Sequence, residues 1–510
     1  MKAWLSITPV RVLALLPLAL SLLLTTVYLR VDFSHYLPQF YRVYNDAIYN
    51  WRQAYTFSAV GFDGGYYTVN ELPAPASFSH FYAHGPGYPM IYGSIGRIFG
   101  WTLTSQIWIN LTLVTLALFA VLSGLRPGLK QALLFVICSV AVWPVLIYLL
   151  TGMTESLHHA TAILFSILMW RLIRDSATMQ VRLYVLLISL LTLLTLTRPT
   201  WGVLFIPVFM LRTKQWRFWK SILLAVLGFA CFAVLFQIHI AVASPYPFLD
   251  ADPRTQHDLI GFIDTRLERA NLNLQAWTQG IPIEVMQRYT LVALLVGIMI
   301  WSVIKRREVG REAVFHLMNI GFPLAINLFA NDMAFYRDFR AMAPHLLLSL
   351  LVLVACRRWW LPTVFIIFQL TMFPAFLTEY RATVEPQFSN SEVISSVKTF
   401  QTQTAPVLIY QPNAPSPWCN TLLFIMENWN DLAMSIPPEL AFVDPGIGLS
   451  FYVGYWNTPP ALNFPLKSRY VLLSPSNRDK IGDQANLTLL RSTIAGNIYR
   501  NEDRECSTRE

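Results

Sequence analysis

Long apolar runs recur along this chain and constrain its fold more than any other feature. Several reach about 18 residues or more, the length at which a helix can cross the hydrocarbon core of a bilayer. Hydrophobic residues make up 55% of the 510 residues, charged residues make up 13%, and the mean hydropathy is +0.45. The composition therefore predicts an α-helical polytopic membrane protein, with the lipid bilayer as its first partner.

The basic residues lie in short clusters between the apolar runs. The formal net charge of +9 could suggest a nucleic-acid partner, but this placement is the positive-inside pattern of membrane proteins. We therefore expect no nucleic acid to bind. With the clusters on the cytoplasmic side, the chain has eleven membrane spans, a cytoplasmic N-terminus and an extracytoplasmic C-terminus. The runs are 12–29, 106–125, 132–150, 156–170, 184–211 as two spans, 222–242, 289–304, 314–329, 341–355 and 359–377.

Two runs need interpretation. The run 12–29 lacks a small-residue cleavage site before Arg30, which favours an uncleaved anchor over a signal peptide. The run 184–211 has basic clusters on both sides, but Arg198 and Pro199 interrupt it near its midpoint. Proline removes a backbone donor and disfavours helix at the residue before it. We therefore expect two short spans, with Arg198 at the outer face.

Two regions outside the spans differ in composition from the rest. The first outer loop, 31–105, is aromatic and proline-rich, which predicts helices lying along the membrane interface. The boundary at 380 separates a transmembrane domain, 1–380, from a small extracytoplasmic α/β domain, 381–510. Short β-branched or aromatic runs predict strands in that domain. These runs are 406–410, 440–443 and 469–473.

The cysteines give no metal-ligand spacing, and three of the five lie within apolar runs. Cys419 and Cys506 lie in the C-terminal domain, where an oxidising compartment would allow them to pair. Two unpaired thiols are an equal alternative, because the sequence does not give their separation.

The stretch 61–89 is rich in polar residues although most of the chain is apolar, and we expect the catalytic residues there. Asp63 is flanked by glycines that permit close backbone approach, although a loop aspartate is often only solvated. Glu71 is a second carboxylate of this stretch. His84 precedes Gly-Pro-Gly and either orients a substrate hydroxyl or is a turn residue.

The predicted topology places further charged residues on the same outer side. Glu155 begins a span, where a carboxylate also suits a helix N-terminus. Arg198 ends an apolar run, and a charge there is costly unless it is paired or faces a polar cavity. Arg337 and Arg340 share the spacing i, i+3 and could grip a phosphate together, or pair with neighbouring aspartates.

Four short motifs follow one another along 12–380. They are Gly-Phe-Asp-Gly-Gly-Tyr-Tyr (61–67), Thr-Gly-Met-Thr-Glu-Ser-Leu (151–157), Leu-Thr-Arg-Pro-Thr-Trp-Gly (196–202) and Tyr-Arg-Asp-Phe-Arg-Ala-Met-Ala-Pro (336–344). In this order they resemble motifs of the GT-C superfamily of polytopic glycosyltransferases. Members of this superfamily take a sugar from a polyprenyl-phosphate donor on the outer or lumenal face.

The resemblance implies roles for individual residues. Asp63 matches the first-loop acid that acts as general base on the acceptor hydroxyl. The first loop lacks the adjacent Asp-Glu pair of the protein mannosyltransferase-like and aminoarabinose transferase-like branches, which makes Glu71 the alternative base. The residues that match the donor phosphate region are Glu155, Arg198, Arg337 and Arg340.

The expected activity is an inverting glycosyl transfer at the outer face of the plasma (inner) membrane. A carboxylate removes the proton of the acceptor hydroxyl, and arginines stabilise the phosphate that leaves. The acceptor is a lipid, a glycan or a protein. No cofactor is required, and a lone Glu155-x-x-His158 pair is insufficient to predict a metal site. The alternative is a transporter or flippase for an anionic lipid-linked sugar, although carriers place their sites near the membrane midplane.

Overall fold

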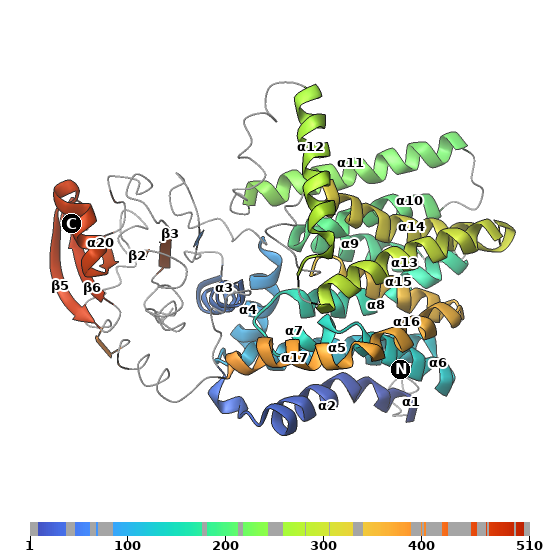
Figure 1. Ribbon diagram of the computed structural model, residues 1–510, viewed down its shortest axis with the longest axis horizontal. Helices are drawn as coiled ribbons and strands as arrows, with labels where there is room; N and C mark the ends of the chain where they lie inside the picture. Colours follow the sequence, from blue (N-terminus) through green and yellow to red (C-terminus); the bar gives the residue numbers. More distant parts are fainter. Residues whose placement is uncertain are drawn as a thin grey trace.

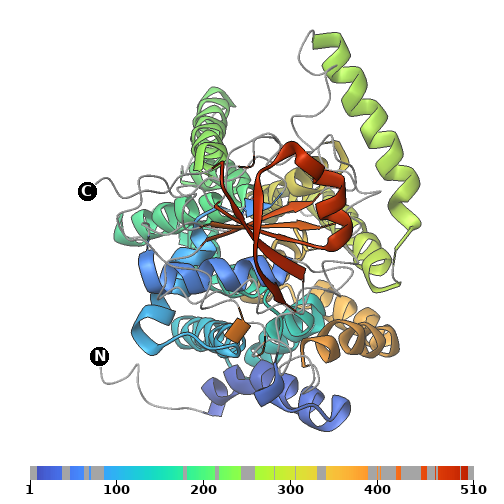
Figure 2. The ribbon, with the colours of Figure 1, turned by 90° about the vertical axis from the view of Figure 1, so that its left-hand side faces the viewer.

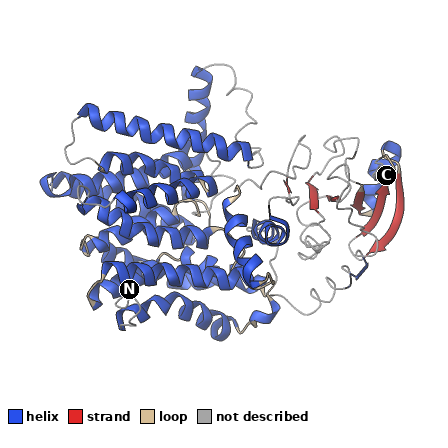
Figure 3. Ribbon diagram, turned by 180° about the vertical axis from the view of Figure 1, so that it is seen from behind, coloured by secondary structure: helices blue, strands red, loops and turns tan. Residues whose placement is uncertain are grey.

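The computed structural model describes most of the chain as a body of helices with a small sheet beside it (Figures 1 and 3). The sheet is formed mainly by residues near the C-terminus, as the sequence predicts. The described residues are 9–36, 46–61, 68–69, 85–175, 181–212, 218–242, 259–280, 282–304, 306–329, 340–388, 399, 402–403, 421–426, 450–455, 466, 469–493 and 496–503.

The helical body contains the apolar runs that the sequence predicts as membrane spans, and these runs are mostly helical. Its α-helices are α1 (Pro9–Val12), α2 (Leu16–Leu23), α3 (Asp46–Val60), α4 (Gly87–Phe99), α5 (Ser105–Leu125), α6 (Leu129–Ala141), α7 (Pro144–Leu149), α8 (Glu155–Asp175), α9 (Val181–Thr197), α10 (Phe205–Leu211), α11 (Phe218–Val242), α12 (Leu259–Gln275), α13 (Pro282–Ile304), α14 (Arg306–Phe329), α15 (Ala343–Ala355), α16 (Trp360–Thr371) and α17 (Phe373–Val384).

Among the residues that the structure describes, six helical segments are long and apolar enough to cross a membrane, and a seventh candidate is a pair of helices with a 68° bend between them. The protein is therefore a membrane protein by the length and composition of its helices. Four further apolar helices are shorter, so the structure bears out six or seven of the eleven predicted spans. Prolines account for part of the difference, because Pro144 begins α7 and Pro374 is the second residue of α17, and each lies within a run that the sequence presents as continuous.

The break predicted at Arg198 and Pro199 is confirmed. Helix α9 ends at Thr197, and Arg198 is extended, with φ −150° and ψ 109°. Pro199 then begins the 3₁₀ segment η6 (Pro199–Leu204), which leads into α10. The residue before a proline is driven out of helical conformation by the proline ring, so the local sequence alone is sufficient for this break.

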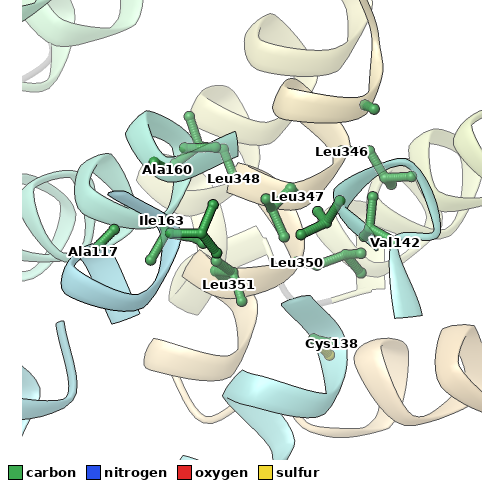
Figure 4. Packing of buried hydrophobic residues seen from close by; sticks show 14 of the residues in the cluster. Ala117, Cys138, Val142, Ala160, Ile163, Leu346, Leu347, Leu348, Leu350 and Leu351 are labelled. Atoms are coloured by element: carbon green, nitrogen blue, oxygen red, sulfur yellow. The ribbon is translucent and has the colours of Figure 1, made fainter. Parts of the chain in front are cut away.

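Helix α15 is the centre of the body, because every one of its residues is buried. Its leucines lie among side chains of α5, α6 and α8, including Ala117, Cys138 and Ile163 (Figure 4). A short helix enclosed on all sides is fully apolar around its circumference, apart from a few polar side chains that find partners. It therefore fixes the positions of the helices packed around it.

The sheet has six strands in the order β1-β3-β2-β4-β6-β5. Strand β4 confirms the prediction for 469–473 and is completely buried, whereas 406–410 and 440–443 lie outside the described residues. The strand β1 was not predicted: it comes from the first loop and pairs in parallel with β3. The bounds are β1 (Thr68–Val69), β2 (Thr421–Met426), β3 (Ser450–Tyr455), β4 (Tyr470–Leu473), β5 (Leu487–Thr493) and β6 (Gly496–Asn501).

Helix α3 lies across the end of the helical body that faces the sheet. It is seen end-on in Figure 1 and lengthwise in Figure 2, so it runs across the direction of the long apolar helices. This orientation agrees with the prediction of interfacial helices in the first loop. Helix α4 packs closely on α3, and a Cβ at Gly93 would lie 2.7 Å from the Ala54 carbonyl oxygen. We call this end of the body the sheet-side end, and the opposite one the far end.

Candidate functional site

A buried ion pair lies at the sheet-side end, where α8 begins and α9 ends. Arg198 Nη2 is 2.7 Å from Glu155 Oε1, and the two side chains are 12% and 2% exposed. The same nitrogen donates to Thr154 Oγ1 at 3.2 Å, and Nη1 donates to the Arg340 carbonyl oxygen at 3.3 Å. Three residues that the sequence assigns to a donor phosphate region, Glu155, Arg198 and Arg340, are thus brought together.

The local sequence explains why both charges lie at helix ends. Glu155 is the first residue of α8, where the partial positive charge of the helix N-terminus favours a carboxylate. Arg198 follows the last residue of α9 and is extended because of Pro199. Neither charge interrupts a helix, and each side chain turns toward the other across the boundary between the two elements.

Two amide side chains of α5 clamp the turn that precedes Glu155. Asn110 donates through Nδ2 to the carbonyl oxygens of Leu149 and Thr151, at 3.3 and 3.0 Å. Gln106 donates through Nε2 to the Gly152 carbonyl oxygen at 3.4 Å. These bonds satisfy carbonyl groups at the end of α7 that would otherwise be buried without partners.

Two tyrosines of α4 complete this clamp. Tyr92 donates through its hydroxyl to Asn110 Oδ1 at 2.5 Å, and the Tyr88 hydroxyl accepts from Gln106 Nε2 at 2.6 Å. The two rings are buried and stacked with their centroids 4.0 Å apart. The turn that leads into Glu155 is therefore held, through α5, by a helix of the first loop. We call Tyr88, Tyr92, Gln106 and Asn110 the polar clamp.

The beginning of α4 also reaches the other member of the ion pair. Thr197 immediately precedes Arg198 in the chain, and a Cβ at Gly87 would lie 1.6 Å from Thr197 Cγ2. Gly85 has φ +74°, and a Cβ there would lie 2.6 Å from the Leu196 carbonyl oxygen. Only glycine permits this approach. Helix α4 thus contacts the segments that carry both Glu155 and Arg198.

A second set of buried polar side chains connects α8, η6, α14 and α15. Trp201 donates through Nε1 to His158 Nδ1 at 3.0 Å, and its ring lies 5.0 Å from that of His345. His345 Nδ1 is 2.9 Å from Asn319 Oδ1. Asn319 Nδ2 donates to the His345 carbonyl oxygen at 2.7 Å and to Ser349 Oγ at 2.8 Å. His158 therefore serves as a hydrogen-bond acceptor for Trp201.

The other predicted site residues fall outside the described part of the chain. These are Asp63, Glu71, His84 and Arg337, together with Cys419 and Cys506. Within the described residues, no three His, Cys, Asp or Glu side chains are grouped so that they could hold a metal ion. The assignment of a base and of a second phosphate-binding arginine stays a prediction.

Sequence reasoning missed the polar clamp and His345, although a signal was present. Gln106 and Asn110 are separated by four residues at the start of an apolar run, and so are Tyr88 and Tyr92 on α4. Residues with this spacing share a helix face. Polar side chains within apolar spans usually face the protein interior and often mark a functional site.

Comparison with known proteins finds no family model that matches the chain, and no curated protein or solved structure with significant similarity to it.

The chemical capacity of the site depends on the donors of Arg198. A guanidinium group has five N–H donors, and the hydrogen bonds to Glu155, Thr154 and Arg340 use three of them. Two N–H groups, on Nε and Nη1, therefore have no acceptor among the described residues. The site offers a fixed, partly neutralised guanidinium with two donors for a ligand oxygen.

Proposed function

We propose that this chain is a membrane glycosyltransferase of the GT-C type, which transfers a sugar from a polyprenyl-phosphate donor to a lipid, glycan or protein acceptor. The observation that carries the proposal is the Arg198 guanidinium, which is 12% exposed at a helix end and has two N–H groups uncommitted among the described residues. A desolvated arginine at the end of an apolar helix is the side chain best suited to a phosphate oxygen.

The leaving group of the proposed reaction is a phosphate. Arg198 would donate to its oxygens and stabilise the negative charge that they gain as the glycosidic bond breaks. Glu155 would hold the guanidinium in one orientation before the ligand arrives, since it accepts from Nη2 at 2.7 Å. Because a phosphate already leaves as a stable anion, no acid catalyst is needed.

The proposed base comes from the sequence. Asp63 would remove the proton of the acceptor hydroxyl as that oxygen attacks the anomeric carbon, with Glu71 as the alternative. A single displacement of this kind inverts the anomeric centre. Arg337 and the Arg340 side chain are proposed as further phosphate contacts, and His84 as a contact to a substrate hydroxyl.

The proposed topology has eleven spans, with the sheet-side end on the extracytoplasmic face of the plasma (inner) membrane. Several basic residues of the far end lie over aromatic rings, as do Lys130 over Trp359 and Arg358 over Trp301. Basic and aromatic residues at one end of a helical bundle are typical of a cytoplasmic interface. This supports a C-terminal domain outside the cell and an N-terminus in the cytoplasm.

The decisive experiment incubates the purified full-length protein in proteoliposomes with radiolabelled polyprenyl-phosphate hexoses and pentoses and a membrane-extract acceptor. We expect label to move from the donor to an acceptor, with release of polyprenyl phosphate. Movement of the intact donor between leaflets, with no bond broken, would instead identify a flippase. Absence of both transfer and movement across the donor panel would overturn the proposal.

A further inference from the structure

Two buried imidazoles lie beside the ion pair, and each has a ring nitrogen without a partner in the described part of the chain. His159 follows Glu155 by one helical turn on the same face of α8, and it is completely buried. Neither of its ring nitrogens has a partner among the described residues, and nor does Nε2 of His345, which is also buried. The His345 ring lies 5.0 Å from the ring of Trp201, which follows Arg198 by three residues in the chain. The nitrogens therefore belong to the surroundings of the proposed donor site.

The protonation of His345 follows from its neighbours. Asn319 uses its amide Nδ2 to donate to the His345 carbonyl oxygen and to Ser349, so its Oδ1 is left as the acceptor. The proton of the neutral ring must then lie on Nδ1 and point at Asn319 Oδ1, 2.9 Å away. Nε2 consequently presents a lone pair and can only accept a hydrogen bond.

The hydrogen-bonding capacity of these ring nitrogens limits which ligand groups they can bind. A lone pair on His345 Nε2 requires a donor, which excludes a phosphate oxygen as its partner. A neutral His159 ring has one donor and one acceptor nitrogen. A hydroxyl group donates and accepts, and so it suits both rings. Buried polar atoms are rarely left without partners in native proteins, so these nitrogens favour a bound group that supplies the missing hydrogen bonds.

We infer that His159 and His345 form a subsite that binds hydroxyl groups of the donor sugar next to Arg198. This inference rests on the proposed function and assigns separate binding roles within it. Arg198 binds the phosphate, and the two imidazoles bind the sugar. The Trp201 ring packs against the His345 ring at a tilt of 38°, while Asn319 fixes the tautomer of His345.

The test measures binding rather than turnover, so that it is independent of the base. Full-length protein in nanodiscs is titrated with a polyprenyl-phosphate sugar that the transfer assay accepts, and with bare polyprenyl phosphate. We expect the wild type to prefer the sugar-linked lipid. His159→Phe and His345→Phe should each lower this preference about tenfold, because a buried hydrogen bond is lost. Their affinity for bare polyprenyl phosphate should remain.

A matched control is His316→Phe. His316 is a buried imidazole of α14 that also has no partner among the described residues, and its ring contacts Phe315. The His316→Phe variant should leave the preference for the sugar-linked lipid unchanged. His345→Gln can still accept a hydrogen bond and should keep part of the preference for the sugar-linked lipid. If the Phe variants also lose affinity for bare polyprenyl phosphate, the preference of His345→Gln is the deciding measurement.

Three results would overturn the inference. If both Phe variants keep the full preference, or if His316→Phe loses as much, the imidazoles hold no sugar, although the transferase proposal stands. If the wild type binds the two lipids equally, no sugar subsite exists at all. Failure of the wild type to bind either lipid would remove the proposed function itself.

Discussion

Two ion pairs of the same composition lie at opposite ends of the helical body, and they differ in almost every physical respect. At the sheet-side end, Arg198 and Glu155 are 2.7 Å apart, with side chains 12% and 2% exposed. At the far end, Arg358 Nε and Glu312 Oε2 are 3.5 Å apart, with side chains 33% and 7% exposed. Arg358 also lies over the Trp301 ring, 4.9 Å from its centroid.

The surroundings of the two pairs favour a functional role for Arg198 and not for Arg358. Arg358 has a long contact and a partly exposed guanidinium over an aromatic ring, which suits a residue anchored at an interface. Arg198 instead has three acceptors, and the turn beside it is fixed by the polar clamp. A buried ion pair contributes little net stability, because desolvation offsets the attraction. The three acceptors of Arg198 and the hydrogen bonds that fix the neighbouring turn therefore favour a functional role for this arginine over a purely stabilising one.

The largest expected effect concerns the assignment of the two ends to opposite sides of the membrane. A reporter fused at the C-terminus or after Tyr380 should read as extracytoplasmic, and one inserted in the loop after Asp175 should read as cytoplasmic, since basic clusters stay inside. Enzymatic reporters of opposite compartment requirement provide the measurement. A cytoplasmic signal from the C-terminus would place the two ion pairs on the wrong sides.

The next effect separates chemistry from binding at the sheet-side end. Asp63→Asn should lower turnover by about 10²- to 10⁴-fold, the usual contribution of a general base. Donor binding should survive, because the arginines and not the base hold the phosphate. Glu71→Gln is the matched variant and should lose far less. The reverse ranking would move the base to Glu71, and normal turnover in both would favour the flippase.

The third prediction compares the arginines directly. Arg198→Ala should weaken donor use by about 1.5 to 3 kcal/mol, the cost of a lost charge-assisted contact, and should destabilise the fold by about 3 to 5 kcal/mol because Glu155 is left buried and unpaired. Arg358→Ala should destabilise the fold less than Arg198→Ala, because the contact to the buried Glu312 is 3.5 Å long and the Arg358 side chain is 33% exposed, and it should leave donor use unchanged. Turnover and thermal unfolding in detergent measure both quantities.

A double variant distinguishes the two losses in Arg198→Ala. Glu155→Gln combined with Arg198→Gln leaves no uncompensated charge, so stability should recover while donor use stays low. Arg198→Lys should regain part of the activity, since lysine lacks the planar fork. Wild-type donor use in the double variant would mean that the pair is only structural.

The smallest expected effect concerns the polar clamp. Tyr92→Phe removes the hydroxyl that donates to Asn110, and loss of about 1 kcal/mol in positioning should lower kcat by about fivefold with little change in donor affinity. Tyr380→Phe is the matched control: Tyr380 lies on α17, which carries none of the named site residues, and its hydroxyl is 2.9 Å from Thr25 Oγ1. Equal losses in the two variants would show general loosening of the fold rather than positioning.

The sequence by itself determined the features that depend on composition and on neighbouring residues. Apolar runs were sufficient to identify a membrane protein, and Pro199 was sufficient to place Arg198 at a helix break, because the ring of proline acts on the adjacent residue. The strand at 469–473 followed from a short β-branched run.

Only the tertiary structure decided which groups meet. Glu155 and Arg198 are 43 residues apart, and the sequence did not identify Glu155 as the partner of Arg198. Likewise, no local pattern shows that Asn110 caps the turn before Glu155, or that Thr68 and Val69 of the first loop join a sheet formed by the C-terminal region. Local periodicity reports which face of a helix is apolar, whereas partners are selected by how the faces of distant helices pack around α15.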